Sequence, residues 1–147
     1  MTVAIGSDPN ASGLKQELID ELTTLGHAVT DFGSDDPIYA NVVIEVGEAV
    51  VAGKFDRGVV LCGTGIGASI AANKVPGVYC ALLTDAYQAE RAALSNNANL
   101  IALGAQITGP QLGRLLVRTW MANAYRPGGR SEPKVQRIVD YAAEHER

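Results

Sequence analysis

The chain is poor in the residues that mark several functional classes. It has only two cysteines and two histidines among its 147 residues. Two cysteines are too few for the dense disulfide framework of a small secreted protein, so they favour a reducing, cytoplasmic compartment. His27 falls at a predicted turn and His145 in a charged tail, and neither is a good candidate for a catalytic residue.

The chain also lacks an excess of basic residues and any long apolar run. Its net charge is −4 and its isoelectric point is about 5.1, which give no sign of a nucleic-acid surface or a basic membrane patch. No apolar run approaches the ~20 residues of a membrane-spanning helix. Residues 2–6 are too short, and lack the basic flank, to be a signal peptide. We therefore expect neither a nucleic acid nor a membrane as partner.

What is present favours one α/β domain over residues 1–147, because 47% hydrophobic residues can build one core. Short apolar segments alternate with amphipathic ones. Strict alternation with right-handed crossovers predicts a Rossmann-like, open, five-stranded parallel sheet with helices on both faces. Strands are predicted at 3–5, 28–32, 58–61, 78–83 and 100–103, with helices near 14–25, 42–52, 68–74, 85–94 and 110–124 and a polar helix after residue 130.

Ligands of such sheets bind beyond the carboxyl ends of the strands. In this sequence those ends carry Asp8, Asp31, Cys62 and Asp85. We expect these side chains to converge on one site.

The most informative segment is residues 61–70, LCGTGIGASI, which follows a buried strand and opens a helix. Its three glycines allow backbone N–H groups to approach a ligand closely, and the helix dipole adds positive potential. That field favours the thiolate of Cys62 as a nucleophile or base. The segment is neither a Walker motif nor a good dinucleotide fingerprint. The alternative is a tight turn with an inert core cysteine.

Other residues have equally plain structural explanations. Cys80, flanked by apolar residues, is expected to be a small core residue. Asp85 can cap a helix or contact a ligand. Trp120 is expected in the core or an interface, and Arg130 and Lys134, taken alone, are typical of solvated tail charges.

Several motifs nevertheless resemble one family along nearly the whole chain. They are Asp56-Arg57-Gly58, the block from Cys62 to Gly67, the segment Ala71-Ala72-Asn73-Lys74, Leu103-Gly104-Ala105 and the closing Gly128-Gly129-Arg130. The chain resembles the ribose-5-phosphate isomerase B / galactose-6-phosphate isomerase family. This resemblance implies aldose–ketose isomerisation of a phosphorylated sugar through a cis-enediolate, with no metal and no organic cofactor.

The resemblance also implies roles for individual residues. Cys62 matches the base that moves a proton between C1 and C2, and Ala68 stands where some members carry a glutamate instead. The loop N–H groups would hold the oxyanion. Thr64, Ser95 and Asn96 are open candidates for moving the hydroxyl proton. The expected substrate and oxyanion contacts are Asp8, Gly63, Gly65, Ile66, Gly67, Ala68 and Asn96.

Sites of this family lie at a homodimer interface. The resemblance therefore implies a homodimer with shared active sites, or a tetramer built from it, in which Asn96 and the tail cations reach into the partner's cleft. Arg130 matches a phosphate ligand. Lys134 stands where a second arginine is usual, so the charge is kept and the bidentate fork is lost.

Four departures from the family pattern bear on the substrate. Pro9 and Ser95 replace histidines, Gln106 replaces an arginine and Asp36 a tyrosine. The histidine missing at Ser95 is assigned to opening a furanose ring. An aldotetrose 4-phosphate cannot close such a ring and needs no ring-opening acid.

Residues 90–97 and 39–41 look like the erythritol-pathway branch, which interconverts D-erythrulose 4-phosphate and D-erythrose 4-phosphate. That reaction is the expectation. The alternatives are a D-ribose 5-phosphate isomerase, a non-catalytic sugar-phosphate-binding protein and a structural dimer with an inert loop.

Overall fold

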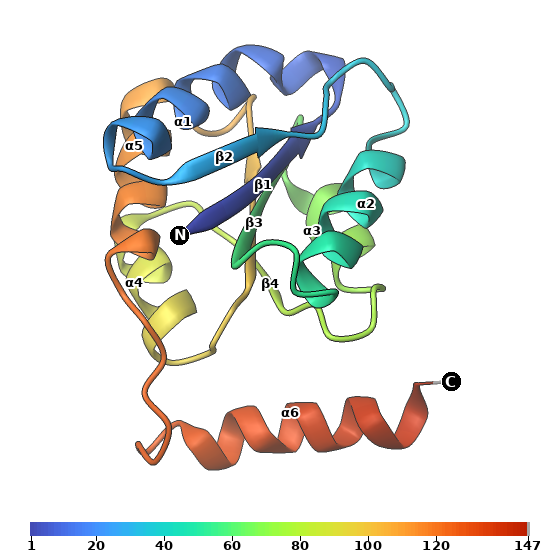
Figure 1. The fold of residues 1–147 in the computed structure, drawn as a ribbon, viewed down its shortest axis with the longest axis vertical. Coiled ribbons are helices and arrows are strands. Elements are labelled where there is room, and N and C mark those ends of the chain that lie inside the picture. The colour runs from blue at the N-terminus through green and yellow to red at the C-terminus, as the bar shows by residue number, and fades with distance from the viewer. Residues whose placement is uncertain (147) are drawn as a thin grey trace.

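The computed structural model describes residues 1–146. Five parallel strands form one sheet in the order β2-β1-β3-β5-β4, which confirms the predicted α/β architecture. Each of the first four strands is followed by a helix that returns the chain to the start of the next strand, and β5 is followed by α5 and α6 (Figure 1). The elements are β1 (Thr2–Ser7), η1 (Pro9–Ala11), α1 (Ser12–Thr24), β2 (Ala28–Asp31), α2 (Tyr39–Val51), β3 (Arg57–Cys62), α3 (Ile66–Ala72), β4 (Cys80–Leu82), α4 (Ala86–Leu94), β5 (Leu100–Gly104), α5 (Pro110–Met121) and α6 (Glu132–His145).

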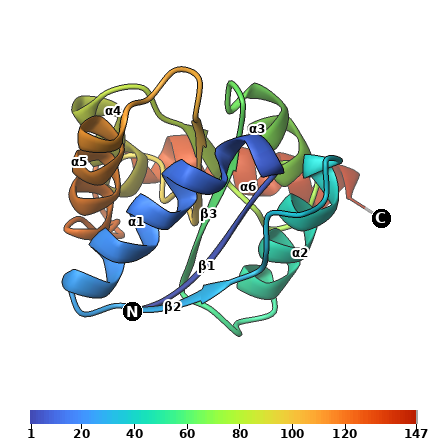
Figure 2. The same cartoon turned by 90° about the horizontal axis from the view of Figure 1, so that it is seen from above.

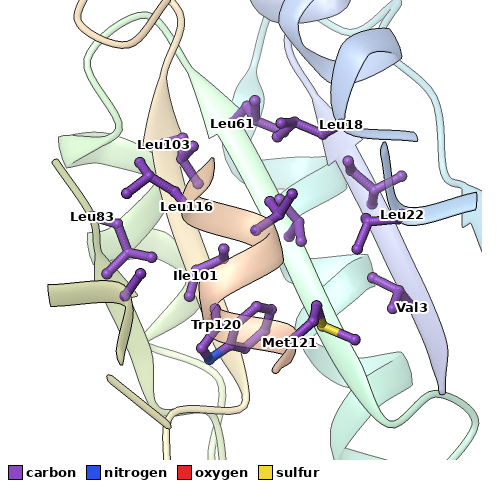
Figure 3. Close-up of a cluster of buried hydrophobic side chains, with 14 of the residues drawn as sticks. Val3, Leu18, Leu22, Leu61, Leu83, Ile101, Leu103, Leu116, Trp120 and Met121 are labelled. Carbon is purple, nitrogen blue, oxygen red and sulfur yellow. The ribbon is translucent and has the colours of Figure 1, made fainter. Parts of the chain in front are cut away.

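The sheet is buried on both faces, because the residues of each strand alternate between two cores. Ile5, Leu61 and Leu103 point to the face covered by α1, α4 and α5. Trp120, which is fully buried, projects from α5 into this core together with Leu116 and Met121 (Figure 3). The opposite face is covered by the valines of α2 and by α3, and it contains the side chain of Cys62.

Strand β4 and helix α5 are shorter than the sequence predicts. Strand β4 begins at Cys80 rather than at residue 78, because the N–H of Val78 turns back to the carbonyl of Val75 and the N–H of Tyr79 donates to the side chain of Asn99. Helix α5 ends at Met121 rather than at residue 124.

The early end of α5 is explained by Arg57, the first residue of β3. Its guanidinium donates to the carbonyl oxygens of Trp120 and Asn123, both at 2.7 Å, and lies 4.8 Å from the centre of the Trp120 ring. These bonds satisfy carbonyls that would otherwise continue the helix. Through Arg57, strand β3 therefore fixes the position at which the segment after α5 leaves the domain.

Helix α6 lies outside the two layers that cover the sheet. Figures 1 and 2 show it beyond the amino ends of the strands, connected to α5 by an extended segment. None of its residues is buried, and Ile138 and Tyr141 are half exposed. Among residues 1–146, no helix is long and apolar enough to cross a membrane.

Candidate active site

The predicted loop that carries Cys62, called the thiol loop (residues 62–67), begins where β3 ends. Cys62 is 3% exposed, and its Sγ accepts a hydrogen bond from the N–H of Gly65 at 3.2 Å. The loop thus places a buried sulfur against a backbone donor at the carboxyl edge of the sheet, as the sequence predicts.

The glycines of this loop are required by geometry. Gly65 has φ = +81°, a left-handed conformation that L side chains rarely adopt, and it forms the N-cap of α3. A Cβ on Gly67 would lie 2.1 Å from the hydroxyl oxygen of Tyr39, so the Tyr39 ring packs directly on the loop. Gly65 is required by its positive φ, and a side chain at residue 67 would force the Tyr39 ring to move.

A neighbouring loop after β5 supports the thiol loop from the other side. The N–H groups of Ala105 and Gln106 donate to the carbonyls of Cys62 and Gly63, both at 2.9 Å. A Cβ on Gly104 would lie 2.3 Å from the carbonyl carbon of Thr64, so these two backbones are in direct contact. This contact explains why a glycine stands at residue 104.

Two of the predicted oxyanion donors already have partners inside the loop. The N–H of Gly65 donates to Cys62, and the N–H of Ile66 donates to the Thr64 hydroxyl at 3.3 Å. Gly67 and Ala68 open helix α3, where the first N–H groups have no intrahelical acceptor. The oxyanion role of residues 63–68 stays a prediction.

Of the acidic residues expected beside the thiol, Asp8 lies next to β3. Its N–H donates to the carbonyl of Leu61 at 3.3 Å, and its buried carboxylate caps η1 through the N–H of Ala11 at 3.1 Å. The expectation that all the strand ends converge is wrong for the two edge strands. Asp31 pairs with the buried Lys15 at 2.8 Å, and Asp85 caps α4 by accepting from the N–H of Gln88 at 2.8 Å.

The remaining predicted site residues form a second group, at the amino ends of the strands. Ser95 and Asn96 follow α4, and both their N–H groups donate to the carbonyl of Arg91. Together with Arg130 and Lys134 they line one cavity of about 420 Å³, called the cation cavity. Its other lining residues are Tyr87, Arg91 and Ser131. The predicted phosphate-binding pair is therefore brought together with two of the predicted proton-transfer candidates.

The two groups lie at opposite ends of the sheet within one chain. The six-residue strand β3 runs from Arg57 to Cys62, and a strand of that length spans about 16 Å. Asn96 precedes β5, whose first residue, Leu100, pairs with Gly58 near the start of β3. A single copy therefore holds the thiol loop at one end of β3 and the cations at the other.

The second thiol is unlike the first. Cys80 is partly buried at the margin of the α2–α3 core. Burial raises the pKa of its thiol to about 12, and a hydrogen bond with Ser69 opposes the shift. It stays protonated at neutral pH, consistent with its predicted structural role.

Three residues beside the two groups had no site role in the sequence analysis. Tyr39 lies on Gly67, the Gln106 side chain lies 3.2 Å from the Cβ position of Gly63, and Arg91 lines the same cavity as Arg130 and Lys134. Helical spacing could have indicated Arg91, because residues four apart on a helix share a face and Arg91 precedes Ser95 by four.

These features define a class: a doubly wound α/β enzyme with a thiol at the carboxyl edge of its sheet and a cationic cavity suited to a phosphorylated substrate. Residues 3–138 match the family model described as Ribose/Galactose Isomerase. The chain belongs to this family and is a sugar-phosphate isomerase.

Individual relatives agree on the family and carry different substrate names. The chain is 44% identical to a D-erythrulose-4-phosphate isomerase of Pectobacterium atrosepticum, over 96% of this chain and 95% of the relative. It is 41% identical to a ribose-5-P isomerase B of Listeria innocua, over 92% and 93%. The solved ribose-5-phosphate isomerase B of Clostridium thermocellum has a TM-score of 0.93 and 40% identity, with 99% of this chain and 100% of that chain covered.

Proposed function

We propose that this isomerase interconverts D-erythrulose 4-phosphate and D-erythrose 4-phosphate. The observation that carries the proposal is that, among residues 1–146, none of the side chains lining the cavity with Ser95 is an imidazole. His27 contacts the N-terminal amine at 3.0 Å, and His145 bonds the carbonyl of Tyr141 on α6. A ring-closed pentose phosphate needs an acid to open it, whereas a tetrose 4-phosphate is already open. The 44% identity to a relative with this name gives further support.

The proposed mechanism uses Cys62 as the C–H base. Its thiolate removes the proton from C2 of the aldose, an enediolate forms, and the same proton returns to C1 to give the ketose. The negative oxygen of the enediolate lies among the N–H groups that open α3. Ser95 and Asn96 stay the candidates for moving the hydroxyl proton, together with Thr64.

Steady-state kinetics on D-erythrulose 4-phosphate and D-ribose 5-phosphate tests the substrate. We expect the higher kcat/KM with the tetrose. A higher kcat/KM with ribose 5-phosphate would instead support the second candidate, which the ribose-5-phosphate isomerase B relatives favour.

A substitution at Ser95 sharpens this test. Ser95→His restores an imidazole at the cavity, and we expect it to raise turnover of ribose 5-phosphate relative to the tetrose. Ser95→Asn is the matched control, because its amide is similar in shape but does not titrate near neutral pH. If both substitutions changed turnover of ribose 5-phosphate equally, the missing imidazole would no longer support a tetrose substrate.

We further propose that the working enzyme is a homodimer with two shared sites. The thiol loop and the cation cavity lie at opposite ends of β3, so a second copy is the simplest source of the missing half of each site. The apolar residues Ile138 and Tyr141, exposed on α6, provide surface for such an association.

Mixing two impaired variants, assayed at a substrate concentration well below the wild-type KM, tests the shared site. Cys62→Ala removes the base and Arg130→Ala weakens phosphate binding, so both are nearly inactive at that concentration, and a mixed dimer contains one intact site. Random reassociation after unfolding should then restore about a quarter of wild-type activity. If the reassociated mixture had no more activity than the separate variants, each active site would have to be formed by a single copy of the chain.

A further inference from the structure

The cation cavity contains more positive charge than the predicted phosphate ligands supply. Arg91 lines it together with Arg130 and Lys134, and none of the seven lining residues is acidic. This occurs in a chain with 16 acidic and 12 basic residues. Three cations gathered without a lining carboxylate indicate a site for a multiply charged anion.

Arg91 lies beside the predicted site residues Ser95 and Asn96, where it can bind such an anion. Its carbonyl accepts from the N–H groups of Ser95 at 2.8 Å and Asn96 at 3.2 Å, so the backbone of Arg91 also orders two predicted site residues. Helical spacing places its side chain on the same face as Ser95.

The guanidinium of Arg91 is only weakly engaged within the chain. It pairs with Glu90 at 3.1 Å, with both side chains more than a third exposed, and surface pairs of this kind stabilise little. Its Nε is buried and has no hydrogen-bond acceptor among residues 1–146. A phosphate oxygen would supply that acceptor.

We infer that Arg91 is a third phosphate-binding residue of the isomerase site, a role that rests on the proposed function. A sugar phosphate has up to two negative charges and three acceptor oxygens. Arg91 and Arg130 each offer a planar fork, and Lys134 adds a single charged donor. Arg91 therefore binds the phosphate end of the substrate, and it takes no part in moving protons.

The test removes the charge while keeping the aliphatic stem. Arg91→Met retains the packing of that stem beside the Tyr87 ring, which lies 5.9 Å from the guanidinium. We expect KM to rise about tenfold with kcat within about twofold of wild type, because a phosphate contact is made equally in ground and transition states. Inhibition by inorganic phosphate should weaken by a similar factor, and Arg91→Lys should recover part of both losses.

Arg118→Met is the matched control, because Arg118 pairs with Glu21 on α1 and lies outside the cavity. It should leave KM and phosphate inhibition unchanged. Wild-type KM and phosphate inhibition in Arg91→Met would overturn the inference. The inhibition constant of inorganic phosphate does not depend on which sugar is turned over. A preference for ribose 5-phosphate would therefore overturn the proposed substrate and leave the role of Arg91 standing.

Discussion

The two ends of the sheet are built on different principles. At the carboxyl end, backbone geometry forms the thiol loop: Gly65 is left-handed, and Gly67 lies against Tyr39. At the amino end, side chains from α4, from the segment before α6 and from the first turns of α6 form the cation cavity, and none of the residues of α6 is buried. The first region tolerates few residue types, whereas the second can be altered one side chain at a time.

This difference teaches how reaction and substrate can vary separately. On the proposed function, the reaction depends on the loop that carries Cys62, where even one added methyl group at Gly67 would meet the Tyr39 ring. On the same proposed function, substrate choice depends on residues such as Ser95 and Lys134, which lie outside the sheet and its two cores. Relatives that share the fold and carry different substrate names agree with this division.

The largest effect should come from the thiol itself. Cys62→Ala should lower kcat by about 10²–10⁴-fold, because general base catalysis contributes that much. The melting temperature and inhibition by inorganic phosphate should stay near wild type, since the cations lie at the other end of β3. Near-normal turnover would exclude Cys62 as the base.

Substitutions in the cation cavity, at the amino ends of the strands, should have a smaller effect than Cys62→Ala, and should change KM rather than kcat. Arg130→Gln should raise KM by about 10–100-fold with a modest change in kcat, because a charged hydrogen bond is worth about 1.5–3 kcal/mol. Lys134→Arg should lower KM, since it adds a fork for the phosphate. Initial-rate measurements separate the two constants, and an unchanged KM in Arg130→Gln would mean that the phosphate binds elsewhere.

The rigidity of the thiol loop can be measured by adding one methyl group. Gly67→Ala brings a Cβ against Tyr39 and should lower the free energy of unfolding by about 1–3 kcal/mol. Gly13→Ala is the control, because no atom lies within 4 Å of its Cβ position in α1. That variant should be as stable as wild type or more stable by up to about 1 kcal/mol. Thermal unfolding compares them, and equal stabilities would contradict the tight packing.

The smallest effect is expected at the second thiol. Cys80→Ala should retain activity, and in the wild type Cys80 should resist iodoacetamide at neutral pH because its pKa is about 12. The folded chain holds this proton more tightly than the unfolded chain. Wild type should therefore lose stability relative to Cys80→Ala as the pH rises from 9.0 towards 12. Rapid labelling of Cys80 at pH 7 would contradict the assignment.

The periodicity of the sequence was sufficient for the sheet and for the thiol loop, because both depend on local patterns. Helix α5 ended early for a reason no local pattern contains: Arg57 binds the carbonyls of Trp120, in the last turn, and of Asn123, just beyond it, from 63 and 66 residues away. The packing of Tyr39 on Gly67 is equally non-local. The cations at residues 130 and 134 gained a role only through the family resemblance, since taken alone they are typical of a charged tail.

The length of strand β3 sets the distance between the two groups of site residues in each chain. The first residue of β3, Arg57, bonds the carbonyls at the start of the segment that leads to Arg130, and its last residue, Cys62, carries the sulfur proposed as the base. Inserting or deleting one residue in this strand would shift both landmarks relative to each other by about 3.3 Å. Evolution can therefore change side chains around the site far more freely than it can change the length of this strand.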